Sequence, residues 1–278
     1  TFFRDGAPYE STGGYNSMHV TALGPIVESI EHLRDMRPEV YPRAKYPDIT
    51  QSRRYQNVFD FCMDTVTIGR FFPKVGDGGS HPSYSVLPPI TWHDASTDSF
   101  EHAYRVFREP KLAWALANAP GWQPSAEFGF TREEIEAEAA LVPDDWNDAS
   151  SLHDGYGLAI VRGGTGDARR AAWAHYDHAR GHKQDDLLDL GMDAFRGNIL
   201  SHMGYPRNWG QWESLWSSHN VARQFEPFLN QVGEPQYMAD AGIAHVTELR
   251  TEPIPAYDDS TGELAGEPLA ASVLIGLG

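Results

Sequence analysis

The spacing of the apolar residues changes once along this chain, and that change most restricts how the chain can fold. In the first half, apolar side chains recur at helical spacing, as at Val20, Leu23 and Val27. After Pro143, short apolar runs alternate with turns rich in Gly, Pro and Asp, which is typical of antiparallel strands. We therefore expect an α+β chain in which helices come first and strands follow.

The same patterns predict individual elements on either side of a boundary near 145–152. A capping-box pattern, Thr131 followed by Glu134, opens the last predicted helix. Helices are expected at 16–36, 52–70, 97–107, 110–119 and 131–140, and a loop at 73–89. Strands are expected at 155–161, 170–176, 187–195, 198–205, 218–225 and 243–249. The prediction is thus an α-helical domain at 1–148 and an antiparallel β-sandwich at 149–278.

Composition restricts the class of partner. The 278 residues are 41% hydrophobic, enough for a buried core, and carry a formal net charge of -17. This charge argues against nucleic acid and anionic membranes as partners, because both require a basic face. Cys62 is the sole cysteine, which excludes an intrachain disulfide and a cysteine-based zinc site. Neither a signal peptide nor a membrane-spanning run is evident, and the start at Thr1 within structured-looking sequence leads us to expect a fragment.

Residues with proton-transfer or metal-binding chemistry are densest at 175–186, where three His and three Asp lie within twelve residues. Histidine carries a proton near neutral pH or binds a metal, and Asp can orient its ring. The alternative interpretation is a polar hairpin turn that happens to be rich in His. Two further clusters, around His202 and His219, follow beside predicted strands. Three such clusters over 45 residues favour a site.

The order of these clusters resembles the β-sandwich motifs of heparinase II/III-like polysaccharide lyases. The matching segments are HKQDDLL at 182–188, ILSHMGYP at 199–206 and SHNV at 218–221, preceded by DGYGLAI at 154–160. In addition, DGAPYESTGGY at 5–15 is similar to the D-G-x-x-x-E motif and following Tyr of the family's (α/α) toroid. The resemblance implies the C-terminal part of a toroid followed by the start of the sandwich, and a periplasmic or secreted protein.

The resemblance also implies a reaction. Such lyases cleave a uronic-acid-containing glycan, an anionic polysaccharide, by β-elimination: the proton at C5 is removed and the glycosidic oxygen at C4 leaves. By this resemblance Tyr15 is the base or acid, His182 is its partner, and Glu10 positions Tyr15 or the sugar. Each residue also has a structural interpretation, as a packed helix-start aromatic, a surface His at a strand end and a structural carboxylate.

Substrate-binding and metal residues follow in the same way. Trp209 and Trp212 are candidates for stacking on sugar faces, and Asn220 of the SHN segment is a further substrate-binding candidate. Trp92, Trp122 and Trp216 are further stacking candidates, although Trp is also a common core residue. Some members of the family hold a structural zinc with ligands at positions that correspond here to Gln184, His202 and His219. Because Gln is a poor zinc ligand, a zinc ion here would be held by His202, His219 and Asp186, with His178 or Gln184 as alternatives to Asp186. The competing interpretation is that His202 and His219 form local hydrogen bonds and that no metal binds.

Two other functions compete with the lyase. The first is a metallohydrolase built on the segment rich in His and Asp, although no H-E-x-x-H motif is present. The second is a non-catalytic glycan-binding protein that has kept the fold, which Gln184 and His202 at expected ligand positions favour. Formation of an unsaturated uronate separates a lyase from both alternatives.

Overall fold

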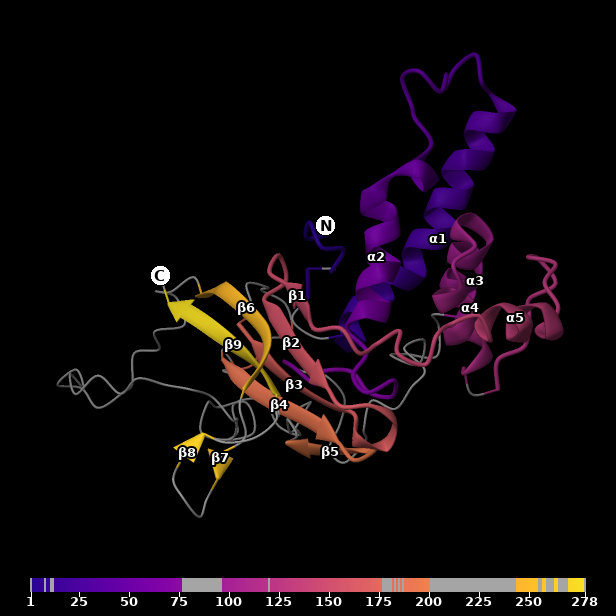
Figure 1. Ribbon diagram of the computed structural model, residues 1–278. Helices are drawn as coiled ribbons and strands as arrows, with labels where there is room; N and C mark the ends of the chain where they lie inside the picture. The colour runs from indigo at the N-terminus through magenta and orange to yellow at the C-terminus, as the bar shows by residue number, and fades with distance from the viewer. Residues whose placement is uncertain are drawn as a thin grey trace.

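The computed structural model describes residues 2–7, 9–10, 13–76, 97–119, 121–176, 182, 184, 186 and 188–200. Beyond these it describes the strands at 244–254, 257–258, 263–264 and 270–277. In Figure 1 the helices gather at one end of the molecule and the strands at the other, with the end of α2 and the N-terminal segment between them.

The helical part contains α1 (Gly13–Met36), α2 (Arg53–Asp64), α3 (Thr97–Phe107), α4 (Pro110–Ala117) and α5 (Arg132–Ala139). A short 3₁₀ turn, η1 (Ile49–Gln51), leads into α2. Pro110 occupies the first turn of α4, and the predicted capping box of Thr131 and Glu134 opens α5. The buried core of this part is rich in aromatic and branched side chains, among them Val20, Val27, Tyr55, Phe59, Phe100, Leu116 and Ile135.

One predicted helix, 52–70, is too long, because α2 ends at Asp64. The Thr65 hydroxyl donates to the Phe61 carbonyl oxygen at 2.9 Å, a bond that competes with the helical backbone bonds. The chain then turns through Ile68 at φ 47° and Gly69 at φ 66°, a left-handed conformation that a helix does not contain. The apolar spacing beyond Asp64 belongs instead to a buried loop.

The strand part is a five-stranded antiparallel sheet in the order β1-β2-β3-β4-β5. Its strands are β1 (Ser151–His153), β2 (Leu158–Gly163), β3 (Arg170–His175), β4 (Asp189–Ala194) and β5 (Gly197–Leu200), and a 3₁₀ turn, η3 (Gly166–Ala168), joins β2 to β3. Further along, β6 (Ala244–Ile254) pairs with β9 (Ala270–Leu277), which lies against β2, and β7 (Tyr257–Asp258) pairs with β8 (Glu263–Leu264). The strand predicted at 218–225 lies outside the described residues.

The fold class is therefore mixed α+β, with helices and an antiparallel sheet as expected. Among the residues that the structure describes, the last helix ends at Ala139 and the first strand begins at Ser151, so the change in pattern after Pro143 is a change from helix to strand. The division into domains at 148/149 stays a prediction. Within the described part of the chain, no helix is both long and apolar enough to cross a membrane.

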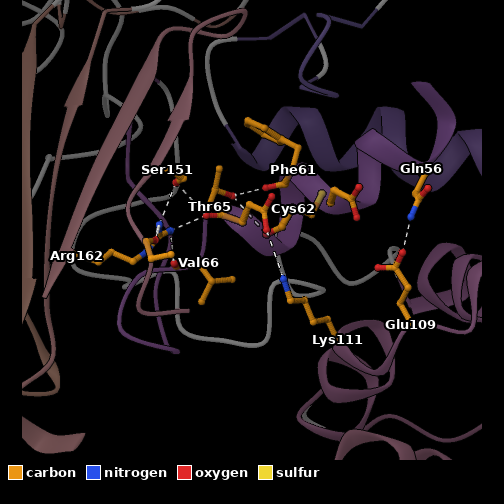
Figure 2. Close-up of polar contacts among 12 residues, drawn as sticks. Gln56, Phe61, Cys62, Thr65, Val66, Glu109, Lys111, Ser151 and Arg162 are labelled. Atoms are coloured by element: carbon orange, nitrogen blue, oxygen red, sulfur yellow. Dashed lines mark hydrogen bonds and ion pairs between the residues drawn. The ribbon is translucent and has the colours of Figure 1, made fainter. Parts of the chain in front are cut away.

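Arg162 of β2 joins the two parts of the molecule (Figure 2). Its guanidinium donates from Nη2 to the carbonyl oxygens of Asp64 at 2.5 Å and Val66 at 2.8 Å. From Nη1 it donates to the Ala149 carbonyl oxygen at 2.7 Å and to the Ser151 hydroxyl at 2.9 Å. Burial lowers the pKa of Arg162 to about 10, so the group still carries its charge at neutral pH. One buried cation thus supplies hydrogen bonds to carbonyl oxygens at the C-terminal end of α2 and attaches this end to the sheet.

The N-terminal segment 2–7 lies between α2 and the turn that joins β1 to β2. Gly6 has φ 93°, and a Cβ there would lie 1.9 Å from the Asn57 carbonyl oxygen of α2. On the other side, Asp5 accepts a hydrogen bond from the Tyr156 backbone N–H at 2.8 Å. Arg4 pairs with Asp154 at 2.6 Å in the same turn. Both parts of the molecule therefore hold this segment in place.

Candidate functional site

Glu10 and His182, 172 positions apart in sequence, meet in the structure. The Nδ1 atom of His182 lies 2.9 Å from the Oε2 atom of Glu10. Glu10 follows the segment held between α2 and the sheet, and His182 lies in the connection between β3 and β4. His182 adopts φ 45°, a left-handed conformation that costs a residue with a Cβ on the order of 1–2 kcal/mol. Such strained backbone often accompanies functional sites.

A cavity of about 540 Å³ opens beside this pair. Glu10, His19 and His182 supply its ionisable groups, and the apolar wall consists of Phe2, Ala22, Leu23 and Ile26. Ligand sites commonly have this size and this character, mostly apolar with a few polar groups. The His19 Nε2 atom lies 3.9 Å from the Oε1 atom of Glu10, so one carboxylate lies near two imidazoles.

Tyr15 lies in the first turn of α1, and its side chain is outside what the structure describes. Position 15 precedes His19 by four residues, so both positions lie on one face of the helix. That the Tyr15 hydroxyl faces His182 across the cavity stays a prediction.

Behind His182, the connection carries buried polar residues that hold the backbone. Asp186 is fully buried and accepts from the Gly76 backbone N–H at 2.6 Å. The His175 Nδ1 atom lies 3.7 Å from the same Asp186 oxygen, and Gln184 is also buried. This arrangement ties the His182 connection to the loop after α2.

The predicted metal site is only partly within the described residues. Asp186 is described, whereas His202, His219 and the alternative ligand His178 lie outside. In the part of the chain that the structure describes, no three His, Cys, Asp or Glu side chains are grouped so as to hold a metal ion. Because Asp186 bonds the Gly76 backbone, its described role is to support the loop.

The predicted substrate residues Trp209, Trp212 and Asn220 lie outside the described residues as well, and so do the stacking candidates Trp92 and Trp216. The stacking candidate Trp122 is buried. Its indole N–H donates to Glu101 at 2.6 Å, so Trp122 packs in the helical core and offers no face to a sugar.

A second buried polar cluster lies away from the cavity, between the loop after α2 and β4. Asp193 accepts from the Thr67 hydroxyl and from the Asn198 side-chain amide, both at 2.6 Å. Burial raises the pKa of Asp193 to about 7, although these hydrogen bonds and the charge of Lys74 oppose the shift. All of the carboxyl's described contacts join elements of the fold, and we assign it a structural role.

With this geometry in view, the chain can be compared with known proteins. Its fold is similar to that of heparinase III, with a TM-score of 0.50 at 13% sequence identity. The match covers 79% of this chain and 32% of that chain, so the chain spans about a third of the length of heparinase III. No protein-family model and no curated protein sequence matches the chain. At this identity the likeness concerns the fold alone.

The sequence did not single out His19. It stands apart from the three clusters rich in His, on a helix whose apolar spacing drew attention instead. The available signal was its spacing of four residues from Tyr15, which places the two positions on one helix face.

Proposed function

We propose that this chain is part of a polysaccharide lyase that cleaves a uronic-acid-containing glycan by β-elimination. The observation that carries the proposal is the hydrogen bond between Glu10 and His182 at the wall of an apolar cavity. Both residues belong to segments that resemble the motifs of heparinase II/III-like lyases, and the fold is similar to that of heparinase III. Glu10 and His182 are far apart in sequence, and their contact at a cavity therefore favours a shared function.

The contact also supports one particular proton-transfer role for His182. An ionised carboxylate only accepts hydrogen bonds, so with Glu10 as partner the Nδ1 atom of His182 is the donor. In the neutral ring Nε2 is then the basic nitrogen, and Glu10 stabilises the positive charge that appears when Nε2 takes up a proton. Glu10 is thus a positioning group for the imidazole.

A β-elimination requires removal of the C5 proton and protonation of the oxygen that leaves C4. In this proposal the His182 Nε2 atom and the Tyr15 hydroxyl divide these two proton transfers. Tyr15 is well placed in sequence for this, since it lies in the first turn of the helix that bears the cavity-lining residues. A group that neutralises the uronate carboxylate is needed as well, because that charge opposes formation of the carbanion.

The test is the appearance of the unsaturated uronate, which absorbs in the ultraviolet, on a panel of uronate polysaccharides. The wild-type chain is expected to form the chromophore, and His182→Ala is expected to lose it. Glu10→Gln should slow the reaction by about 10²-fold or more, because it removes the charge that supports the imidazolium. Glycan cleavage without the chromophore would instead indicate a hydrolase, and binding without cleavage a non-catalytic glycan-binding protein.

Further parts of the proposal concern residues outside the described ranges. Trp209, Trp212 and Asn220 are proposed to bind the polysaccharide, and His202, His219 and Asp186 to hold a zinc ion. Such a zinc would link neighbouring strands and strengthen the fold, and no proton transfer above depends on it. A periplasmic or secreted location is proposed on the same resemblance.

A further inference from the structure

We propose that His19 is a specificity residue: it binds the carboxylate of a sugar in the cavity and so selects a uronate over a neutral glycan. This inference rests on the proposed function, because it assigns a substrate class and a binding group to the same cavity. His19 supplies the neutralising group that the elimination requires.

The first argument is the division of roles within the cavity. Glu10 places one oxygen 2.9 Å from His182, a hydrogen-bond distance. Its other oxygen is 3.9 Å from the His19 Nε2 atom, which is too long for a hydrogen bond. The His19 side chain is 44% exposed and lines the cavity. Of the two imidazoles, Glu10 therefore orients His182, and His19 presents Nε2 at the cavity wall.

The second argument is electrostatic. The chain has a formal net charge of -17, so an anionic glycan is repelled unless the cavity is locally positive. Among the described residues that line the cavity, the only groups able to carry positive charge are His19 and His182. His182 offsets the charge of Glu10, which leaves His19 as the group that can offset a charge on the ligand.

The third argument is the apolar surface beside His19. Leu23 and Ile26 follow it by four and seven residues, a spacing that places all three on one face of α1. Their span along the helix axis is about 10 Å at 1.5 Å per residue. A sugar that lies with its apolar face on Leu23 and Ile26 can direct a carboxylate toward the imidazole. An imidazole beside two apolar side chains thus matches a uronate ring, which has a charged carboxylate and an apolar face.

The experiment compares two hexasaccharide probes by titration calorimetry on the full chain carrying Tyr15→Phe, which keeps Glu10 and His182 in place and prevents cleavage of the probes during the titration. One probe alternates glucuronate and N-acetylglucosamine, and the other is its carboxyl-reduced, neutral counterpart. For His19→Ala and His19→Gln, Kd for the glucuronate probe should rise about tenfold, the loss of one charged hydrogen bond. Kd for the neutral probe should change by less than about twofold. The matched control is His32→Ala, an exposed histidine of the same helix 13 residues further on, which should change neither.

Two results would overturn the role of His19: an equal loss of affinity for both probes, which indicates packing, or no loss for either. The lyase is judged separately, by whether the wild-type chain forms unsaturated uronate from the glucuronate probe. A wild-type chain that prefers glucuronate but forms no product counts against the lyase alone. An active chain whose His19 variants keep the wild-type preference counts against His19 alone.

Discussion

Replacement of Arg162 by Met should test how the helices and the sheet are held together. The change removes the donor from three carbonyl oxygens, those of Asp64, Val66 and Ala149, in contacts that are buried at Val66 and partly buried at the other two. At about 1 kcal/mol for each lost hydrogen-bond partner, the loss is about 3 kcal/mol. The lowered pKa of Arg162 shows that burial also disfavours its charge, and Met avoids that cost. A net loss of about 2–3 kcal/mol follows, a large part of the 5–15 kcal/mol typical of domains.

Urea unfolding is the assay, and Arg37→Met is the control. Arg37 pairs with Glu39 at the surface, where its side chain is 58% exposed, so its loss should cost less than about 1 kcal/mol. For Arg162→Met the midpoint should fall by roughly 1 M, given a slope near 3 kcal/mol per M. Arg162→Lys should fall between them, because one ammonium cannot reach both sets of acceptors. A loss for Arg162→Met no larger than that of the control would refute this account of the junction.

Three further perturbations have expected outcomes. Gly6→Ala should lower both the melting temperature and the proposed lyase activity, because its Cβ would clash with the Asn57 carbonyl oxygen. The control is Gly121→Ala, at φ 70° with open space around it, which should lower the free energy of unfolding by only about 1–2 kcal/mol. The folded state raises the pKa of Asp193 from 3.8 to about 7, so the contribution of this group to stability is complete below about pH 4 and is lost as the pH rises through 7. Relative to Asp193→Asn, the stability of the wild-type chain, measured by urea unfolding, should therefore fall between pH 4 and 7. If zinc is bound, a chelator should lower the melting temperature and His219→Ala should abolish that effect; metal analysis that finds no zinc would contradict the site.

Local sequence patterns predicted most of the described helices and strands, because apolar periodicity is a property of neighbouring residues; the short strand β1 was not expected. The helix expected at 97–107 has those bounds in the structure, and the predicted capping box opens α5. The helix expected at 52–70 failed at its end, since α2 stops where Thr65 and the distant Arg162 take up its last carbonyl oxygens. No pattern within 52–70 contains Arg162, so its effect was out of reach of local reasoning.

The residues of the candidate site likewise include some that the sequence indicated and some that it missed. Glu10 and His182 were reached by resemblance of short motifs, and the structure brings the two side chains together, although their catalytic roles stay predictions. His19 was missed because it lies outside the clusters rich in His, and because the sequence does not show that it lines the same cavity as the distant His182. Trp122 shows the opposite error, since its residue type suggested sugar stacking while its neighbours in the fold bury it.

The placement of the N-terminal segment has a consequence for how this protein can change over generations. A single short segment carries Asp5 and Gly6, which anchor it to the sheet and to α2, and Glu10, which orients His182. A substitution that loosens the anchor also displaces the carboxylate a few residues later. Selection for folding and selection for the proposed chemistry therefore act on the same few codons. A variant library made here should yield few clones that keep one property without the other.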